Sequence, residues 1–151
     1  MDELVQWLGE QLDEDERIAQ AAPGPTWEHR QARGDFDVSA VFEDYVAVAD
    51  PERNTVVYSD VSAELLPFAL RHDPARVLRE IDSKRRMVAR YEASLERSVE
   101  FRRRADVGAE NEAQKAQRSH ENIQLLVLLD VVKLLALPYA DRPGYRNEWR
   151  P

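Results

Sequence analysis

The sequence of 151 residues contains no cysteine and only five glycines. Without cysteine the chain can form neither a disulfide nor a thiolate metal site. The few glycines form no phosphate-binding loop, and the sequence contains no nucleophile elbow. None of the three histidines, His29, His72 and His120, has the H-E-x-x-H spacing of a zinc site. We therefore expect no cofactor and no metal, and a non-catalytic protein rather than an enzyme.

A basic and then apolar leader is also missing from the N-terminus. The longest apolar run, residues 123–137, is shorter than a membrane span and contains Asp130 and Lys133. These features predict a cytoplasmic location and no membrane partner. At this length a single domain, 1–151, is the default expectation.

The net charge of −8 is unevenly distributed. Residues 1–66 carry 16 acidic and 4 basic side chains, whereas residues 67–104 carry 6 acidic and 11 basic ones. The two regions could attract each other within one molecule, or they could mark surfaces for partners.

Residues 73–138 dominate the pattern and predict a long antiparallel helical hairpin. Asp73-Pro74 is typical of a helix start, and no proline or glycine follows until Gly108. Pro138 ends the second helix. Both arms have mostly apolar or small residues at alternating steps of three and four, which is a coiled-coil pattern. The positions are Val77, Ile81, Lys84, Val88, Tyr91, Leu95, Ser98, Arg102 and Ala105, then Ala109, Ala113, Ala116, His120, Ile123, Val127, Asp130, Leu134 and Leu137.

If the chain turns at residues 106–108, these two seams face each other. Lys84 then meets Asp130, which predicts an ion pair that sets the register. The alternative is that both side chains reach water at the edge of the seam. In the same register His120 packs beside Leu95. Eleven Ile, Leu or Val residues in 123–137 cover most of the helix circumference, so we expect the remainder of the chain to surround this helix.

The rest of the chain is predicted to cover the hairpin. Residues 1–22 form an amphipathic helix that ends at Pro23-Gly24-Pro25, and 26–35 are predicted to be a loop. Residues 36–60 predict a small antiparallel β meander, with strands at 36–42, 45–49 and 55–58. Residues 61–72 predict a short helix bent at Pro67, and 139–151 form a tail anchored by Tyr145 and Trp149. The fold class is therefore mainly α, with a minor β component.

Two groups are candidates for function. One is the corner where the short helix meets the hairpin, with His72, Asp73 and Arg76. The alternative is that Asp73 caps the helix, Arg76 is solvated and His72 packs at the corner. The other group is basic, favours phosphate binding, and consists of Arg85, Arg86, Arg102, Arg103 and Arg104. Interleaved glutamates favour a salt-bridged surface helix instead.

Several strings resemble those of an uncharacterised family of small proteins from actinobacteria, mainly Streptomyces-like, and from their phages. They are Leu12-Asp-Glu-Asp-Glu16 followed by Ala-Pro-Gly-Pro and Trp27, Arg71-His-Asp-Pro-Ala-Arg-Val-Leu78 through Lys84-Arg-Arg86, and Leu134-Leu-Ala-Leu-Pro-Tyr-Ala-Asp141 through Glu148-Trp-Arg150. The resemblance implies family membership and no activity, because the family's function is unknown.

Three functional hypotheses follow. The leading one is a non-catalytic interaction or accessory protein, associated with phage, that presents the hairpin and binds an unknown protein partner through its polar tip, residues 100–114. The second is nucleic-acid association through the arginine-rich arm. The third is an enzyme with a site around His72. The sequence leaves a homo-oligomer open, since the first seam could pair with another molecule.

Overall fold

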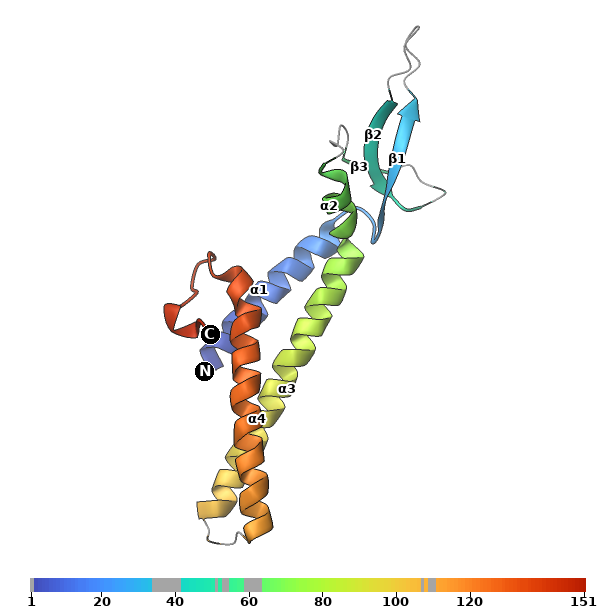
Figure 1. Ribbon diagram of the computed structural model, residues 1–151. Helices are drawn as coiled ribbons and strands as arrows, with labels where there is room; N and C mark the ends of the chain where they lie inside the picture. The colour runs from blue at the N-terminus through green and yellow to red at the C-terminus, as the bar shows by residue number, and fades with distance from the viewer. Residues whose placement is uncertain are drawn as a thin grey trace. The chain divides into compact units, whose positions relative to one another are not determined.

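The computed structural model describes residues 2–33, 42–50, 52, 55–58, 64–106, 108 and 111–151. It is mainly helical with one small antiparallel sheet, which confirms the predicted fold class (Figure 1). The elements are α1 (Asp2–Ala21), β1 (Trp27–Arg33), β2 (Phe42–Val48), β3 (Val56–Tyr58), α2 (Leu66–Arg71), α3 (Pro74–Asp106), α4 (Glu112–Ala136) and the short 3-10 turns η1 (Leu137–Tyr139) and η2 (Asn147–Trp149).

The chain forms two compact units. The first combines Met1–Asp13 with Asp82–Pro151, and the second is Glu14–Ile81. Helices α1 and α3 each contribute residues to both units. The single domain expected from the chain length stays a prediction.

The first unit contains the predicted hairpin. Helix α3 ends at Asp106, and Gly108 adopts a left-handed backbone with φ 75° while its N–H donates to the carbonyl of Ala105 at 2.9 Å. Asn111 then caps α4 in a reciprocal capping box with Gln114. The reversal at Gly108 is therefore confirmed. Helix α4 begins at Glu112, three residues later than the predicted seam.

The predicted inner face is correct for α3 and wrong for α4. Tyr91 and Ser98 of the α3 seam are buried, although Arg102 is exposed. All eight members of the second seam from Ala113 onwards are exposed, including His120, which was expected beside Leu95. The inner face of α4 is marked instead by its contacts with α3: Arg97 pairs with Glu121 at 3.2 Å, and Ser98 donates to Asn122 at 3.1 Å.

The choice of face has a physical reason. Helix α4 has two apolar stripes, and the one that faces α3 carries no charged residue between Leu125 and Tyr139. Its members are buried or half-buried, and they are Leu125, Leu128, Val132, Leu135 and Tyr139. The other stripe contains Asp130, which would lose its hydration at the helix–helix contact. Consequently residues 123–137 are covered on one side only, and the expectation of a surrounded helix is wrong.

The predicted Lys84–Asp130 pair is also wrong. The Nζ of Lys84 donates to the hydroxyl of Tyr139 at 2.9 Å, whereas Asp130 is exposed on the opposite face of α4. The later start of α4 and its different face together place Tyr139, not Asp130, opposite Lys84.

The tail closes the first unit against the start of α1. Trp7 is buried against Tyr145 and Trp149, with ring centroids 5.5 and 5.4 Å away, and its indole N–H donates to the carbonyl of Pro143 at 3.0 Å. On the same helix Leu4, Leu8 and Leu12 are buried. The prediction that Tyr145 and Trp149 anchor the tail within the molecule is confirmed.

The second unit contains the sheet, in the order β1-β2-β3 with antiparallel neighbours. Strands β2 and β3 agree with the predicted strands at 45–49 and 55–58, while most of the strand expected at 36–42 lies outside the described residues. The loop predicted at 26–35 is wrong, because Trp27–Arg33 pairs with β2. This strand is polar and lies at an edge of the sheet, so its sequence lacks the alternation that predicts strands.

Candidate functional site

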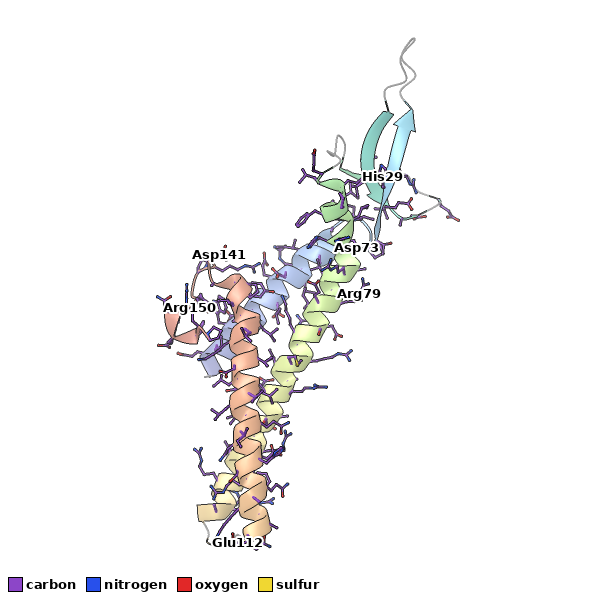
Figure 2. All side chains as sticks on the ribbon, in the orientation of Figure 1. His29, Asp73, Arg79, Glu112, Asp141 and Arg150 are labelled. Carbon is purple, nitrogen blue, oxygen red and sulfur yellow. The ribbon has the colours of Figure 1, made fainter. Side chains whose placement is uncertain are left out.

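Asp73 lies at the start of α3 (Figure 2) and, with Arg76, stabilises the first turn of this helix. The carboxylate of Asp73 accepts from the backbone N–H of Arg76 at 2.7 Å, which is an N-cap contact. The Arg76 guanidinium binds the carbonyl of Arg71 at 2.7 Å and the carboxylate of Glu80 at 2.8 Å. Both side chains thus have structural partners, and Asp73 has the capping role that the sequence offered as the alternative.

His72 packs on the helix that precedes it. Its ring stacks on Phe68 with centroids 4.1 Å apart, and its Nδ1 is 2.8 Å from the Phe68 carbonyl oxygen. The side chain is exposed. This is the packed-corner arrangement rather than that of a histidine held in a reactive pocket.

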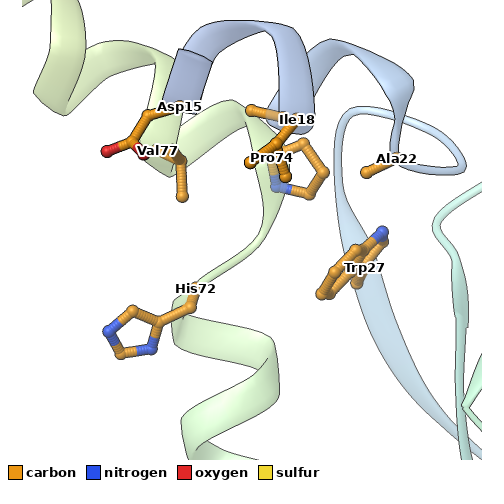
Figure 3. Close-up of a pocket in the computed structure, with 8 residues that line it drawn as sticks. Asp15, Ile18, Ala22, Trp27, His72, Pro74 and Val77 are labelled. Atoms are coloured by element: carbon orange, nitrogen blue, oxygen red, sulfur yellow. The ribbon is translucent and has the colours of Figure 1, made fainter. Parts of the chain in front are cut away.

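A cavity of about 210 Å³ lies beside His72 (Figure 3). Asp15 and His72 are the only titratable groups among its lining residues, and in Figure 3 the imidazole points away from Trp27. The other lining residues are apolar or aromatic: Ile18, Ala19, Ala22, Trp27, Pro74 and Val77. The volume is below the roughly 300–1,000 Å³ of typical small-molecule sites. The described part of the chain also contains no group of three or more His, Asp or Glu residues that could hold a metal ion.

The basic residues of α3 are largely paired with carboxylates of the same unit. Arg85 binds Asp13 at 2.6 Å, and Arg86 binds Asp82 at 2.8 Å. Such pairing leaves less free positive charge for a phosphate backbone than the sequence suggested. The structure therefore favours the salt-bridged surface helix for these two arginines.

At the end of the hairpin, Arg103 and Arg104 both bind Glu100, at 2.9 and 2.8 Å. Hydrogen bonds from Arg103 and then Arg104 lower the pKa of the Glu100 carboxyl to about 2. The hydrogen bond to Glu100 in turn raises the pKa of Arg103. Arg102 is exposed beside this cluster. The predicted basic tip is thus partly neutralised by its own glutamate.

A second hollow, of about 370 Å³, lies in the first unit between α1 and α3. Its lining combines Glu92 and Glu96 with apolar and uncharged side chains, namely Val5, Gln6, Tyr91 and Leu95. These groups include no nucleophile–base pair and no cation for an anionic ligand, so the hollow carries no recognisable chemistry.

The most unusual surface is the outer face of α4, which we define as Ala113, Ala116, His120, Ile123, Val127, Asp130, Leu134 and Leu137. All eight are exposed. The exposed fractions of the large apolar members are 64% for Ile123, 57% for Val127, 54% for Leu134 and 41% for Leu137. Leu126, at the edge of this face, is 63% exposed. The sequence identified the stripe by its spacing but assigned it to the interior of the hairpin.

One further property of this helix concerns membranes. The segment Glu112–Tyr139 is long and apolar enough to cross a bilayer by length and composition. Its large apolar residues are concentrated after position 122, whereas the preceding turns are mostly polar.

No curated protein and no solved structure matches the chain. Residues 1–151 match a family described as a family of unknown function, DUF6221. The match covers the full length, so both units and the outer face of α4 lie inside the family's boundaries. The chain belongs to this family of unknown function.

Proposed function

We propose that this protein is non-catalytic and acts by binding protein through the outer face of α4. The observation that supports the proposal is the run of large apolar side chains exposed along one helix face from Ile123 to Leu137. Contiguous apolar patches of this kind mark interaction surfaces. Fully burying an exposed Ile, Leu or Val side chain is worth roughly 1.5–3 kcal/mol. The five large side chains here, Leu126 included, are 41–64% exposed, so covering the rest of each contributes about half of that value and together they favour association.

A protein surface suits this face better than lipid does. Asp130 lies in the middle of the apolar run, and His120 lies one turn before the run begins at Ile123. A charged side chain at the centre of a bilayer costs roughly 2.5–3.5 kcal/mol by insertion scales. A protein partner can offer a hydrogen bond or an opposite charge at the same position. The proposal accordingly includes a cytoplasmic location and no membrane partner.

The tip of the hairpin is a weaker candidate than the sequence suggested. Arg103 and Arg104 are already engaged by Glu100. Exposed ion pairs of this kind contribute little to binding, because they are well solvated before any partner arrives. We therefore move the contact from the tip to the outer face of α4.

The proposal extends to the source of the protein. The strings in the N-terminal helix, around residues 71–86 and in the tail support an origin in actinobacteria or their phages, and an accessory role. They contain no residue pattern for catalysis.

Photo-crosslinking in cells tests the proposed function. A photo-reactive amino acid at position 123 reports on the outer face, and the same group at the exposed Arg90 of α3 is the matched control. We expect protein adducts from position 123, whether with another protein or with a second copy, and few from position 90. If neither position gives a protein adduct, the outer face binds no protein and the proposal is wrong.

A further inference from the structure

The outer face of α4 has a spacing that reads the same from either end. Its eight positions are separated by steps of three, four, three, four, three, four and three residues. They are therefore symmetric about position 125. A second α4 running in the opposite direction can present the same face with every position in a shared layer, as in an antiparallel coiled coil.

We infer that the partner of this face is a second copy of the chain, bound antiparallel about a twofold axis near position 125. This inference rests on the proposed function and names its partner. In a twofold contact each layer occurs twice, with the roles of the two copies exchanged. The layers pair Ala113 with Leu137, Ala116 with Leu134, His120 with Asp130, and Ile123 with Val127.

The side chains in these layers complement each other in size. The two alanines lie opposite the two leucines, and the two β-branched residues lie opposite each other. Alternating large and small residues across a contact keeps the layers filled without overpacking. Leu126 lies beside Val127 and close to the axis, so it meets its own copy.

The two polar members decide the register and the direction. His120 and Asp130 are the only polar residues of the face, and the antiparallel register places them in the same layer. The imidazole can donate a hydrogen bond to the carboxylate there. A parallel, in-register pair would place Asp130 against Asp130, and an antiparallel register shifted by seven residues would leave both groups facing apolar side chains. Both alternatives are disfavoured by repulsion or by unpaired polar groups.

Both polar groups are available for this contact. His120 and Asp130 are exposed, and within the part of the chain that the structure describes neither side chain has a hydrogen bond or an ion pair. On the opposite face, by contrast, Glu121 is paired with Arg97. The polar side chains of α4 that still lack a partner and could complement each other, His120 and Asp130, therefore lie on the face that α3 leaves open.

The first test is the mass of the full chain in solution over a range of concentrations. We expect a reversible dimer in the wild type, and a dissociation constant raised by at least about tenfold in Leu134→Glu. Val99→Glu is the matched control, because Val99 is 58% exposed on α3, outside the outer face. Circular dichroism checks that each variant is folded. A wild type that stays monomeric, or equal effects of the two variants, overturns the inference.

A charge exchange tests the layer itself. His120→Glu places two carboxylates in one layer, and Asp130→Lys removes the carboxylate partner of His120, so each weakens the dimer. The double variant His120→Glu/Asp130→Lys places a carboxylate opposite an ammonium group in this layer, and it should restore the dimer. Failure of the double variant to recover the dimer, when both single variants have lost it, contradicts the assigned register.

Cross-linking tests the direction, since the natural chain contains no cysteine. Mixing Ala116→Cys with Leu134→Cys copies should give a mixed cross-link with a short bifunctional maleimide. Neither variant alone should cross-link efficiently. Self-cross-linking of Ala116→Cys would indicate a parallel pair and overturn the inference.

The outcomes also separate this inference from the proposed function. A monomer whose position 123 cross-links to a different protein leaves the proposed function standing and removes the dimer. A monomer that floats with phosphatidylcholine–phosphatidylglycerol vesicles, and loses this binding in Leu134→Glu, shows a lipid-facing helix and removes both. Cross-links from position 123 to a second copy support both.

Discussion

Lys84 donates a hydrogen bond from Nζ to the hydroxyl of Tyr139 at 2.9 Å, and its ammonium lies 4.9 Å from the centre of the same ring. The guanidinium of Arg142 lies 4.6 Å from that ring. Tyr139 is buried, so this contact joins the first half of α3 to η1, which follows α4, and fixes the register of the hairpin far from the turn at Gly108.

Removing the Tyr139 hydroxyl should destabilise the fold. Tyr139→Phe keeps the ring but leaves the Lys84 ammonium without this acceptor, which we expect to lower the free energy of unfolding by about 1–2 kcal/mol. Tyr145→Phe is the matched control, since the buried Tyr145 hydroxyl has no hydrogen-bond partner among the described residues. Urea unfolding followed by circular dichroism measures both. If Tyr145→Phe lowered the free energy of unfolding more than Tyr139→Phe does, the Lys84–Tyr139 hydrogen bond would not be what fixes the register of the hairpin.

Two serines on the inner face of α3 should respond in opposite ways to alanine. Ser94 is fully buried and its hydroxyl has no partner within the described chain, so Ser94→Ala should raise the free energy of unfolding by up to about 1 kcal/mol. Ser98 donates to Asn122 at 3.1 Å, so Ser98→Ala should lower it by about 0.5–1.5 kcal/mol. Chemical denaturation distinguishes the two signs, and equal signs would refute the assigned hydrogen bonding.

Gly144 and Gly9 offer a second matched pair. Gly144 has φ 87°, and a Cβ there would lie 2.9 Å from Nε1 of Trp7, so Gly144→Ala should destabilise the tail by at least about 1 kcal/mol. Gly9 lies within α1, and a Cβ added there would meet open space, so Gly9→Ala should stabilise by about 0.5–1 kcal/mol. Thermal unfolding and tryptophan fluorescence report on both. Unchanged fluorescence in Gly144→Ala would show that the tail does not depend on this close approach.

Glu100 should titrate well below an ordinary glutamate. Hydrogen bonds from Arg103 and Arg104 hold the pKa of its carboxyl at about 2, below the usual 4.5. Because the folded-state pKa is depressed, the stabilising effect is complete above about pH 4.5 and is lost as the pH falls towards 2. Carbon-detected NMR titration measures the midpoint directly. In Arg103→Ala/Arg104→Ala the midpoint should return towards 4.5, and an unchanged midpoint would exclude these arginines as the cause.

The start of α3, the turn of the hairpin and the end of α4 could be predicted from sequence. Asp73 caps α3, Gly108 reverses the chain, and Pro138 follows α4 immediately after Leu137. These features depend on local backbone chemistry, which a few neighbouring residues specify. The stacking of His72 on Phe68 is the packed arrangement, one of the two that the sequence allowed at this corner.

Other features were decided only by tertiary structure. Strand β1 has no apolar alternation, and it exists because β2 supplies its hydrogen bonds. For α3 a single stripe was suitable for burial, so its inner face followed from the spacing. Helix α4 has two stripes with the same spacing, and periodicity cannot choose between them. Packing buried the stripe that ends at Tyr139 and left the other stripe, with Asp130, Ile123, Val127, Leu134 and Leu137, in solvent. The reason is that the Asp130 carboxylate keeps its hydration in solvent and would lose it at a helix contact.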